Sequence, residues 1–230
     1  AMMKSIAQSE LDRKRFVYSD IGFILLQQVV EAVTGKTLDA YLVSEFYRPM
    51  GLEHTLFQPL NRYKKADIMP TAANDYLRRQ DLCGYVHDEA AAFMGGVSGN
   101  AGLFSTAQEL GKIYQMILNE GELDGKRYLR PETCRIFTTE KSAVSHRGLG
   151  YDKPNLKDPK ANACASSAPA SVYGHTGFTG TCAWVDPEND LVYIFLSNRL
   201  CPDAWNGKLN SMKIRQAVQE VIYQSLYTPE

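Results

Sequence analysis

The chain has 230 residues, of which 44% are hydrophobic, enough apolar material for a sizeable core. Its 25 lysine and arginine residues nearly balance 26 acidic residues. Because the charges are interspersed rather than gathered into runs, the composition argues against nucleic acid or a membrane surface as the partner. We therefore expect a small molecule to be the partner.

Membrane spans, disulfides and metal sites have little support in the sequence. The longest apolar runs, such as residues 21–26, are too short to cross a bilayer, and the first residues lack the apolar stretch of a signal peptide. Five widely spaced cysteines without a Cys-x-x-Cys pair favour free buried thiols. The four histidines are equally scattered, so we expect no metal site.

Helices and one long loop are predicted over the first 140 residues. From Asp20 to Gly35, apolar residues recur at helical spacing and predict one buried helix that ends at the glycine. Thr37 can begin a second helix, which runs to Phe46. Residues 61–102 lack a sustained period and predict a loop layer, with a short helix over 87–93.

Further elements follow from cap and turn residues. Thr106 and Glu109 have the spacing of a capping box, which predicts a helix up to Gly121. The sequence LDGK at 123–126 predicts a tight turn, and Pro131 can open a short helix to Phe137. The pattern over 146–152 favours a strand.

The last third of the chain predicts a sheet followed by a helix. Residues 181–186 and 191–198 are rich in aromatic and β-branched residues and flank the turn sequence PEND, which predicts an antiparallel hairpin. A helix from Ser211 would carry Ile214, Ala217, Val218, Val221, Ile222 and Leu226 on its inner face. The fold class is α+β, an antiparallel sheet covered by helices with a helical and loop subdomain.

The stretch GHTGFTGT at 174–181 places a histidine among glycines and threonines. Glycine lets a backbone N–H approach a ligand closely, and a hydroxyl with an imidazole can bind a carboxylate or an oxyanion. The alternative is that these residues only lead into the hairpin.

The tripeptide Tyr18-Ser19-Asp20 stands just before the first long helix. A helix N-terminus favours a phenolate, so Tyr18 is a candidate general base. The alternative is that Ser19 or Asp20 caps the helix and Tyr18 is a packing aromatic.

Together with GGVSGNAGLFSTAQEL at 95–110, these stretches resemble the serine β-lactamase and penicillin-binding-protein superfamily, and most closely its class C and esterase-like branch. The resemblance implies one domain over 1–230, with a helical and loop region over 16–140 and the hairpin and C-terminal helix over 141–230. It implies catalytic roles for Tyr18, Asp20 and His175. It also implies that His175, Thr176 and Gly177 form the substrate-side strand and that the Phe178 N–H is one donor of the oxyanion hole.

Two residues depart from the family's pattern. Asp20 stands where many members have asparagine, and an ionised aspartate only accepts hydrogen bonds. His175 stands where others have lysine, and a neutral imidazole is a weaker anchor for a carboxylate. These changes favour esters or peptides over β-lactams as substrates.

The family's Ser-x-x-Lys nucleophile motif does not occur in the 230 residues, and 17 residues precede Tyr18. We therefore expect the N-terminal part of the domain to be missing. One hypothesis is that a longer parent protein is a serine hydrolase that cleaves an amide or ester, such as a cell-wall peptide. The other is a binding or scaffolding module attached to another enzyme, such as a glycoside hydrolase.

The resemblance also sets expectations about partners and location. It implies no cofactor and a periplasmic or extracytoplasmic bacterial location. In the family, two N-terminal strands pair beside the C-terminal hairpin. An uncovered edge exposes backbone donors and acceptors, so we expect either the missing N-terminal segment or self-association to cover it.

Overall fold

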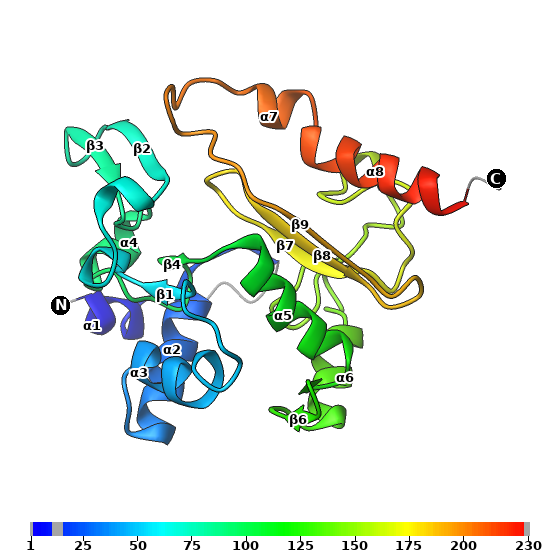
Figure 1. Cartoon of the computed structure of the whole chain (residues 1–230), viewed down its shortest axis with the longest axis horizontal. Coiled ribbons are helices and arrows are strands. Elements are labelled where there is room, and N and C mark those ends of the chain that lie inside the picture. The colour runs from blue at the N-terminus through cyan, green and yellow to red at the C-terminus, as the bar shows by residue number, and fades with distance from the viewer. Residues whose placement is uncertain (1, 11–15, 228–230) are drawn as a thin grey trace.

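A three-stranded antiparallel sheet, in the order β7–β8–β9, forms the centre of the fold. Its strands are β7 (Tyr173–Thr176), β8 (Cys182–Asp186) and β9 (Leu191–Phe195). Figure 1 shows α8 (Ile214–Tyr227) on one side of this sheet, and α5 (Ala107–Leu118) and α6 (Pro131–Thr139) on the other. The computed structural model describes residues 2–10 and 16–227. The α+β class and the hairpin are confirmed.

The remaining elements are short, and most precede the sheet in the chain. The helices are α1 (Met2–Ala7), α2 (Ile21–Thr34), α3 (Leu38–Leu42), α4 (Glu89–Phe93) and α7 (Lys208–Ser211), with the π-helical turn η1 (Val43–Tyr47) and the 3-10 turns η2 (Pro59–Asn61), η3 (Lys65–Asp67) and η4 (Pro159–Ala161). The strands are β1 (Leu56–Phe57), β2 (Pro70–Asp75), β3 (Gln80–Cys83), β4 (Leu103–Phe104), β5 (Glu122–Leu123) and β6 (Lys126–Arg127). They pair as β1–β4, β2–β3 and β5–β6.

Strand β8 is the core of the sheet, since all five of its residues are buried. Trp184 packs in one cluster with Val172 and Tyr193. Helix α8 packs against this cluster through Ile222, and its Tyr223 Oη donates to Asp186 Oδ2 at 2.8 Å.

The face that α8 turns toward the sheet differs from the predicted one. Gln219 and Tyr223 are buried, whereas Val218 and Val221 are exposed. The reason is a hydrogen bond: Gln219 Oε1 accepts from the buried Ala165 N–H at 2.8 Å. A buried amide that satisfies a backbone donor outweighs the apolar pattern on this helix.

Helix α2 forms as predicted, but the expectation that it is buried is wrong. It ends at Gly35, which adopts a φ of 67°, a conformation that favours glycine. Within α2, Ile24 and Gln27 are buried. Six other large apolar side chains are exposed: Ile21, Phe23, Leu25, Leu26, Val29 and Val33. We call these six residues the α2 apolar face.

Two local predictions are wrong. Residues 61–102 contain the hairpin β2–β3, whose register shifts twice, so its side chains do not alternate regularly; the predicted short helix is present as α4. Residues 146–152 form no named strand, only isolated bridges from Gly148 to Lys141 and from Asp152 to Gly174.

Glu109 does not complete the predicted capping box. Thr106 Oγ1 does accept from the Glu109 N–H at 3.3 Å. The Glu109 carboxylate, however, binds the segment before β1, where it accepts from the N–H groups of Glu53 and His54 and from Thr55 Oγ1. These three donors compete successfully with the single N–H at the cap.

Other predictions agree with the structure. Asp124 and Gly125 both have positive φ in the turn between β5 and β6, as the LDGK sequence predicted. All five cysteines are free thiols, three of them buried. Within the described ranges, no helix combines the length and the apolar character needed to cross a membrane.

Candidate functional site

Tyr18 and His175 lie side by side, although 157 positions separate them in the sequence. Their ring centroids are 6.2 Å apart and the ring planes differ by 30°. Tyr18 lies just before α2, and His175 lies on the edge strand β7. The prediction that these two side chains lie close together is confirmed.

Arg147 is the third member of this site. Its guanidinium carbon lies 4.8 Å from the centroid of the Tyr18 ring. Its Nη1 lies 3.0 Å from His175 Nε2, and its Nη2 lies 3.4 Å from Asp152 Oδ2. One cation therefore joins the tyrosine and the histidine.

Asp152 and His146 surround Arg147 from the same segment. The Asp152 residue is 5% exposed, and its Oδ1 lies 2.9 Å from His146 Nε2. The backbone of Asp152 exchanges two hydrogen bonds with Gly174, at 2.7 and 3.1 Å. The segment 146–152 is thus attached to β7 beside His175.

The electrostatics at Tyr18 do not favour a phenolate overall. Burial raises the pKa of Tyr18, as do the carboxylates of Asp20 and Asp152, and Arg147 lowers it by less. Tyr18 in this structure is therefore a phenol whose deprotonation depends on nearby positive charge. Its side chain is accessible, since the residue is 55% exposed.

Asp20 occupies the N-cap position of α2, yet its carboxylate does not cap the helix. Ser19 Oγ accepts from the Ile21 N–H instead, at 3.2 Å. Burial raises the pKa of Asp20, the negative charge of Asp88 raises it further, and His175 lowers it. Within the described part of the chain, the Asp20 side chain has no hydrogen-bond partner, so it is available to a ligand.

Asp88 and Asn100 connect Asp20 to the loop that follows α4. Asp88 Oδ1 accepts from the Ala91 N–H at 2.7 Å, as the cap of α4, and from Asn100 Nδ2 at 3.1 Å. Asn100 Oδ1 in turn accepts from Ser98 Oγ at 2.6 Å. The sequence SGN at 98–100 thus contributes to the surroundings of Asp20.

The glycines of GHTGFTGT are required by packing. A Cβ on Gly174 would lie 2.1 Å from the Ala183 carbonyl oxygen, so only glycine lets β7 approach β8 at this register. A Cβ on Gly177 would lie 2.1 Å from Thr181 Oγ1. The structure therefore supports the interpretation that these glycines serve the hairpin. They also lie next to His175.

Thr176 is the last residue of β7, and Gly177 and Phe178 follow it. The Phe178 carbonyl accepts from Arg199 Nε at 2.7 Å, and its ring lies under the Arg199 guanidinium and against His87. The Phe178 N–H has no acceptor among the described residues. A donor of this kind can bind a ligand carbonyl or oxyanion.

Comparison with known proteins shows the family of the chain. The family model described as Beta-lactamase matches residues 1–216. The chain belongs to the β-lactamase family. A relative from Escherichia coli (strain K12), which has the provisional name D-alanyl-D-alanine carboxypeptidase, is 38% identical over 197 residues, which are 80% of this chain and 45% of the relative. One from Salmonella gallinarum, with the same name, is 32% identical over 91% of this chain and 51% of its own length.

Solved structures of β-lactamase-like proteins share the fold. A β-lactamase from Mycobacterium bovis superposes with a TM-score of 0.59 at 19% identity, over 92% of this chain and 64% of its own. The octameric penicillin-binding protein homologue from Pyrococcus abyssi gives 0.58 at 18% identity, over 94% of this chain and 47% of its own. This β-lactamase-family chain spans about half the length of the curated relatives it matches.

Sequence analysis missed Arg147, Asp152 and Asp88. The available signal was the adjacent pair His146-Arg147 in a segment rich in glycine, which we interpreted as a strand. Residues near a site often lie on loops placed by a rigid scaffold. The tertiary contact of this loop with β7 has no counterpart in a local sequence pattern.

Proposed function

We propose that this chain is part of a β-lactamase-like serine hydrolase that cleaves an amide or ester through a tyrosine-assisted acyl-enzyme. The observation that carries the proposal is the Tyr18–His175 stack with Arg147 at its edge. A tyrosine beside a cation and next to an open strand end is suited to move a proton between a nucleophile and a leaving group.

Five of the six predicted site residues receive a role in this proposal. Tyr18 exchanges protons, and the Phe178 N–H binds the developing oxyanion. Thr176 and Gly177 present the backbone edge along which an extended substrate lies. Asp20 accepts a hydrogen bond from the substrate, such as one from a peptide N–H.

The substrate class follows from the relatives and from the site. The relatives carry the name of a carboxypeptidase that acts on D-alanyl-D-alanine, so we propose a cell-wall peptide with a free carboxylate. Such a peptide would require an extracytoplasmic bacterial location. Arg147 supplies positive charge near the place where this carboxylate would bind.

The nucleophile would come from a further segment, and two uncovered surfaces support this part of the proposal. One is the α2 apolar face. The other is the outer edge of β9, which pairs with β8 alone within the described residues. We propose that a segment carrying Ser-x-x-Lys covers both surfaces in a longer parent protein, and that self-association covers them in the isolated chain.

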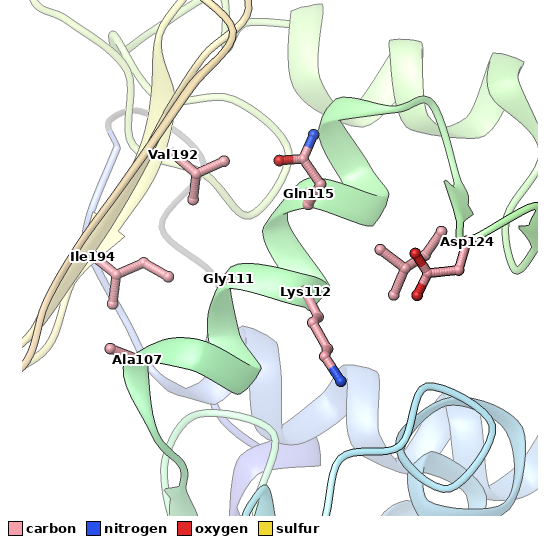
Figure 2. Close-up of a pocket in the computed structure, with 8 residues that line it drawn as sticks. Ala107, Gly111, Lys112, Gln115, Asp124, Val192 and Ile194 are labelled. Atoms are coloured by element: carbon pink, nitrogen blue, oxygen red, sulfur yellow. The ribbon is translucent and has the colours of Figure 1, made fainter.

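A hollow of about 490 Å³ adjoins this edge of β9. Figure 2 shows Val192 and Ile194 of β9 directed toward α5, where Gly111 leaves space between the helix and the strand. The hollow contains none of the six predicted site residues. We therefore assign it to packing by the additional segment and not to substrate binding.

The test begins with the chain as it is. Incubated with a fluorophosphonate or penicillin probe, the 230-residue chain should form no stoichiometric adduct, and it should not hydrolyse a chromogenic cephalosporin or a nitrophenyl ester. An adduct mapped to one of its own serines would contradict the proposed division of the site.

The second step uses the longer parent sequence. It should carry a Ser-x-x-Lys motif ahead of residue 1, react with the probe at that serine, and release D-alanine from a D-alanyl-D-alanine peptide. The variant Tyr18→Phe should lower kcat by about 10²–10⁴-fold, whereas Phe137→Leu, on exposed α6, should not. A parent without the motif would instead support the binding or scaffolding module.

A further inference from the structure

Arg147 determines the protonation pattern of His175 by its hydrogen-bonding chemistry. A guanidinium has only donors, so the His175 nitrogen that it contacts, Nε2, must be the one without a proton. The other ring nitrogen, Nδ1, lies 2.7 Å from the Thr176 carbonyl oxygen, which only accepts. Nδ1 therefore carries the proton, and the ring is the neutral Nδ1–H tautomer.

Both ring nitrogens of His175 are thus occupied by partners from the protein. The imidazole has no unshared lone pair for a substrate proton while Arg147 donates to it. This differs from the catalytic role that the family resemblance implies for His175. The neighbouring Tyr18 hydroxyl has no hydrogen bond to any described residue, so it remains available.

Arg147 is itself held in place. Asp152 Oδ2 faces its Nη2 at 3.4 Å, and Asp152 Oδ1 lies 2.9 Å from His146 Nε2. The Lys153 N–H donates to the same carboxylate at 3.0 Å, and the backbone of Asp152 is paired with Gly174. A carboxylate fixed on both sides limits the rotamers of the arginine.

We propose that Arg147 is a positioning residue: it holds His175 as the neutral Nδ1–H tautomer and leaves Tyr18 as the side chain that exchanges protons. The assignment of proton exchange to Tyr18 rests on the proposed function, whereas the tautomer does not. The groups that face His175 are Tyr18, Asp20 and Arg147. Behind them lie Asp152 and His146 on the loop, and Asp88 beside Asp20.

The tautomer can be measured on the 230-residue chain by NMR of ¹⁵N-labelled histidine, with His175 assigned by the variant His175→Gln. At pH 7, Nδ1 should give a protonated-type shift and Nε2 an unprotonated-type shift. In Arg147→Gln, whose side-chain amide can donate or accept, the share of Nδ1–H should fall, because only the Thr176 carbonyl then favours it. Arg147→Lys should retain Nδ1–H, because an ammonium also only donates.

Arg135→Gln is the matched control, since Arg135 is half exposed on α6 and pairs with Glu120; its His175 spectrum should equal that of the wild type. An Nε2–H or doubly protonated wild-type ring would overturn the proposal, as would an Arg147→Gln spectrum that does not change. If circular dichroism shows that Arg147→Gln does not fold, the wild-type and Arg147→Lys spectra decide.

The role of Tyr18 has its own readout in ¹³C-labelled tyrosine. Arg147→Gln should raise the pKa of the Tyr18 ring, because it removes the cation that lowers it; an unchanged titration would overturn this part. Neither spectrum needs a nucleophile or a substrate. A parent protein without hydrolase activity would therefore end the proposed function and leave the tautomer assignment standing.

Discussion

Glu109→Gln tests how the buried carboxylate of α5 joins the helix to the segment before β1. Glu109 Oε1 accepts from the N–H groups of Glu53 and His54, both at 2.9 Å, and Oε2 accepts from Thr55 Oγ1 at 2.6 Å. A glutamine retains one acceptor oxygen and turns an NH₂ donor toward groups that are themselves donors. About two charge-assisted hydrogen bonds are lost, each contributing about 1.5–3 kcal/mol. We expect Glu109→Gln to lower the free energy of unfolding by about 3 kcal/mol.

Urea unfolding followed by tryptophan fluorescence measures this change at pH 7. The control is Glu132→Gln, since Glu132 is 70% exposed and lies 3.5 Å from Arg135; it should change the free energy of unfolding by less than about 0.5 kcal/mol. If Glu109→Gln is as stable as this control, the carboxylate does not hold the segment as the distances indicate.

The pH dependence of the free energy of unfolding tests the same contact independently. Burial raises the pKa of Glu109, but hydrogen bonds from Thr55, His54 and Glu53 outweigh burial, and the pKa is lowered overall. A lowered carboxyl pKa stabilises the fold above the unfolded value, about 4.3, and this contribution is lost as pH falls through the folded value. The difference between the wild type and Glu109→Gln should therefore shrink below about pH 4.

Three further predictions concern the site and the uncovered surfaces. Gly174→Ala should lower the free energy of unfolding by about 3 kcal/mol or more, because it forces a Cβ against the Ala183 carbonyl. Gly22→Ala, in an open position of α2, should raise it by about 0.5–1 kcal/mol. Equal shifts of the thermal midpoint in the two variants would refute the packing argument. Asp20→Asn should raise the thermal midpoint at pH 7, because burial and Asp88 raise the pKa of Asp20 and its ionised form opposes folding. This gain should vanish as the pH falls below the pKa of Asp20 in the unfolded chain. A gain that persists at low pH would contradict the prediction. Light scattering at micromolar concentration should show self-association through the β9 edge, or mass spectrometry should detect a co-purified fragment. A dispersed monomer without such a fragment would contradict the proposal that another segment or a second copy covers this edge.

Local patterns predicted most elements that have strong periodicity or turn chemistry. Three elements follow from local sequence: the hairpin β8–β9 from aromatic and β-branched residues around PEND, helix α5 from helical spacing, and the turn at 124–125 from LDGK. Two motifs far apart in the chain, around Tyr18 and around His175, were placed together through family resemblance, and the ring contact confirms their proximity.

The errors arise where long-range polar contacts decide the structure. Gln219 determines which side of α8 is buried because it satisfies the Ala165 N–H, and no periodicity in α8 reports that donor. The predicted burial of α2 assumed that other parts of the same chain cover an apolar helix. In the structure, the α2 apolar face is exposed instead. Arg147 was missed because its three partners come from three separate segments.

Helix α2 is held at its middle by one amide. Gln27 Oε1 accepts from the Gly99 N–H at 3.0 Å, and Gln27 Nε2 donates to Glu31 Oε1. Ile21, the first residue of α2, lies six residues before this point, or about 9 Å along the axis at 1.5 Å per residue, and Tyr18 comes three residues earlier. A tilt of about 5° around Gln27 would displace the tyrosine by about 1 Å, a distance that can change a reaction rate about 100-fold. Whatever packs on the α2 apolar face therefore also changes the position of Tyr18 relative to His175 and Arg147, so the cover of α2 and the geometry of the candidate site change together.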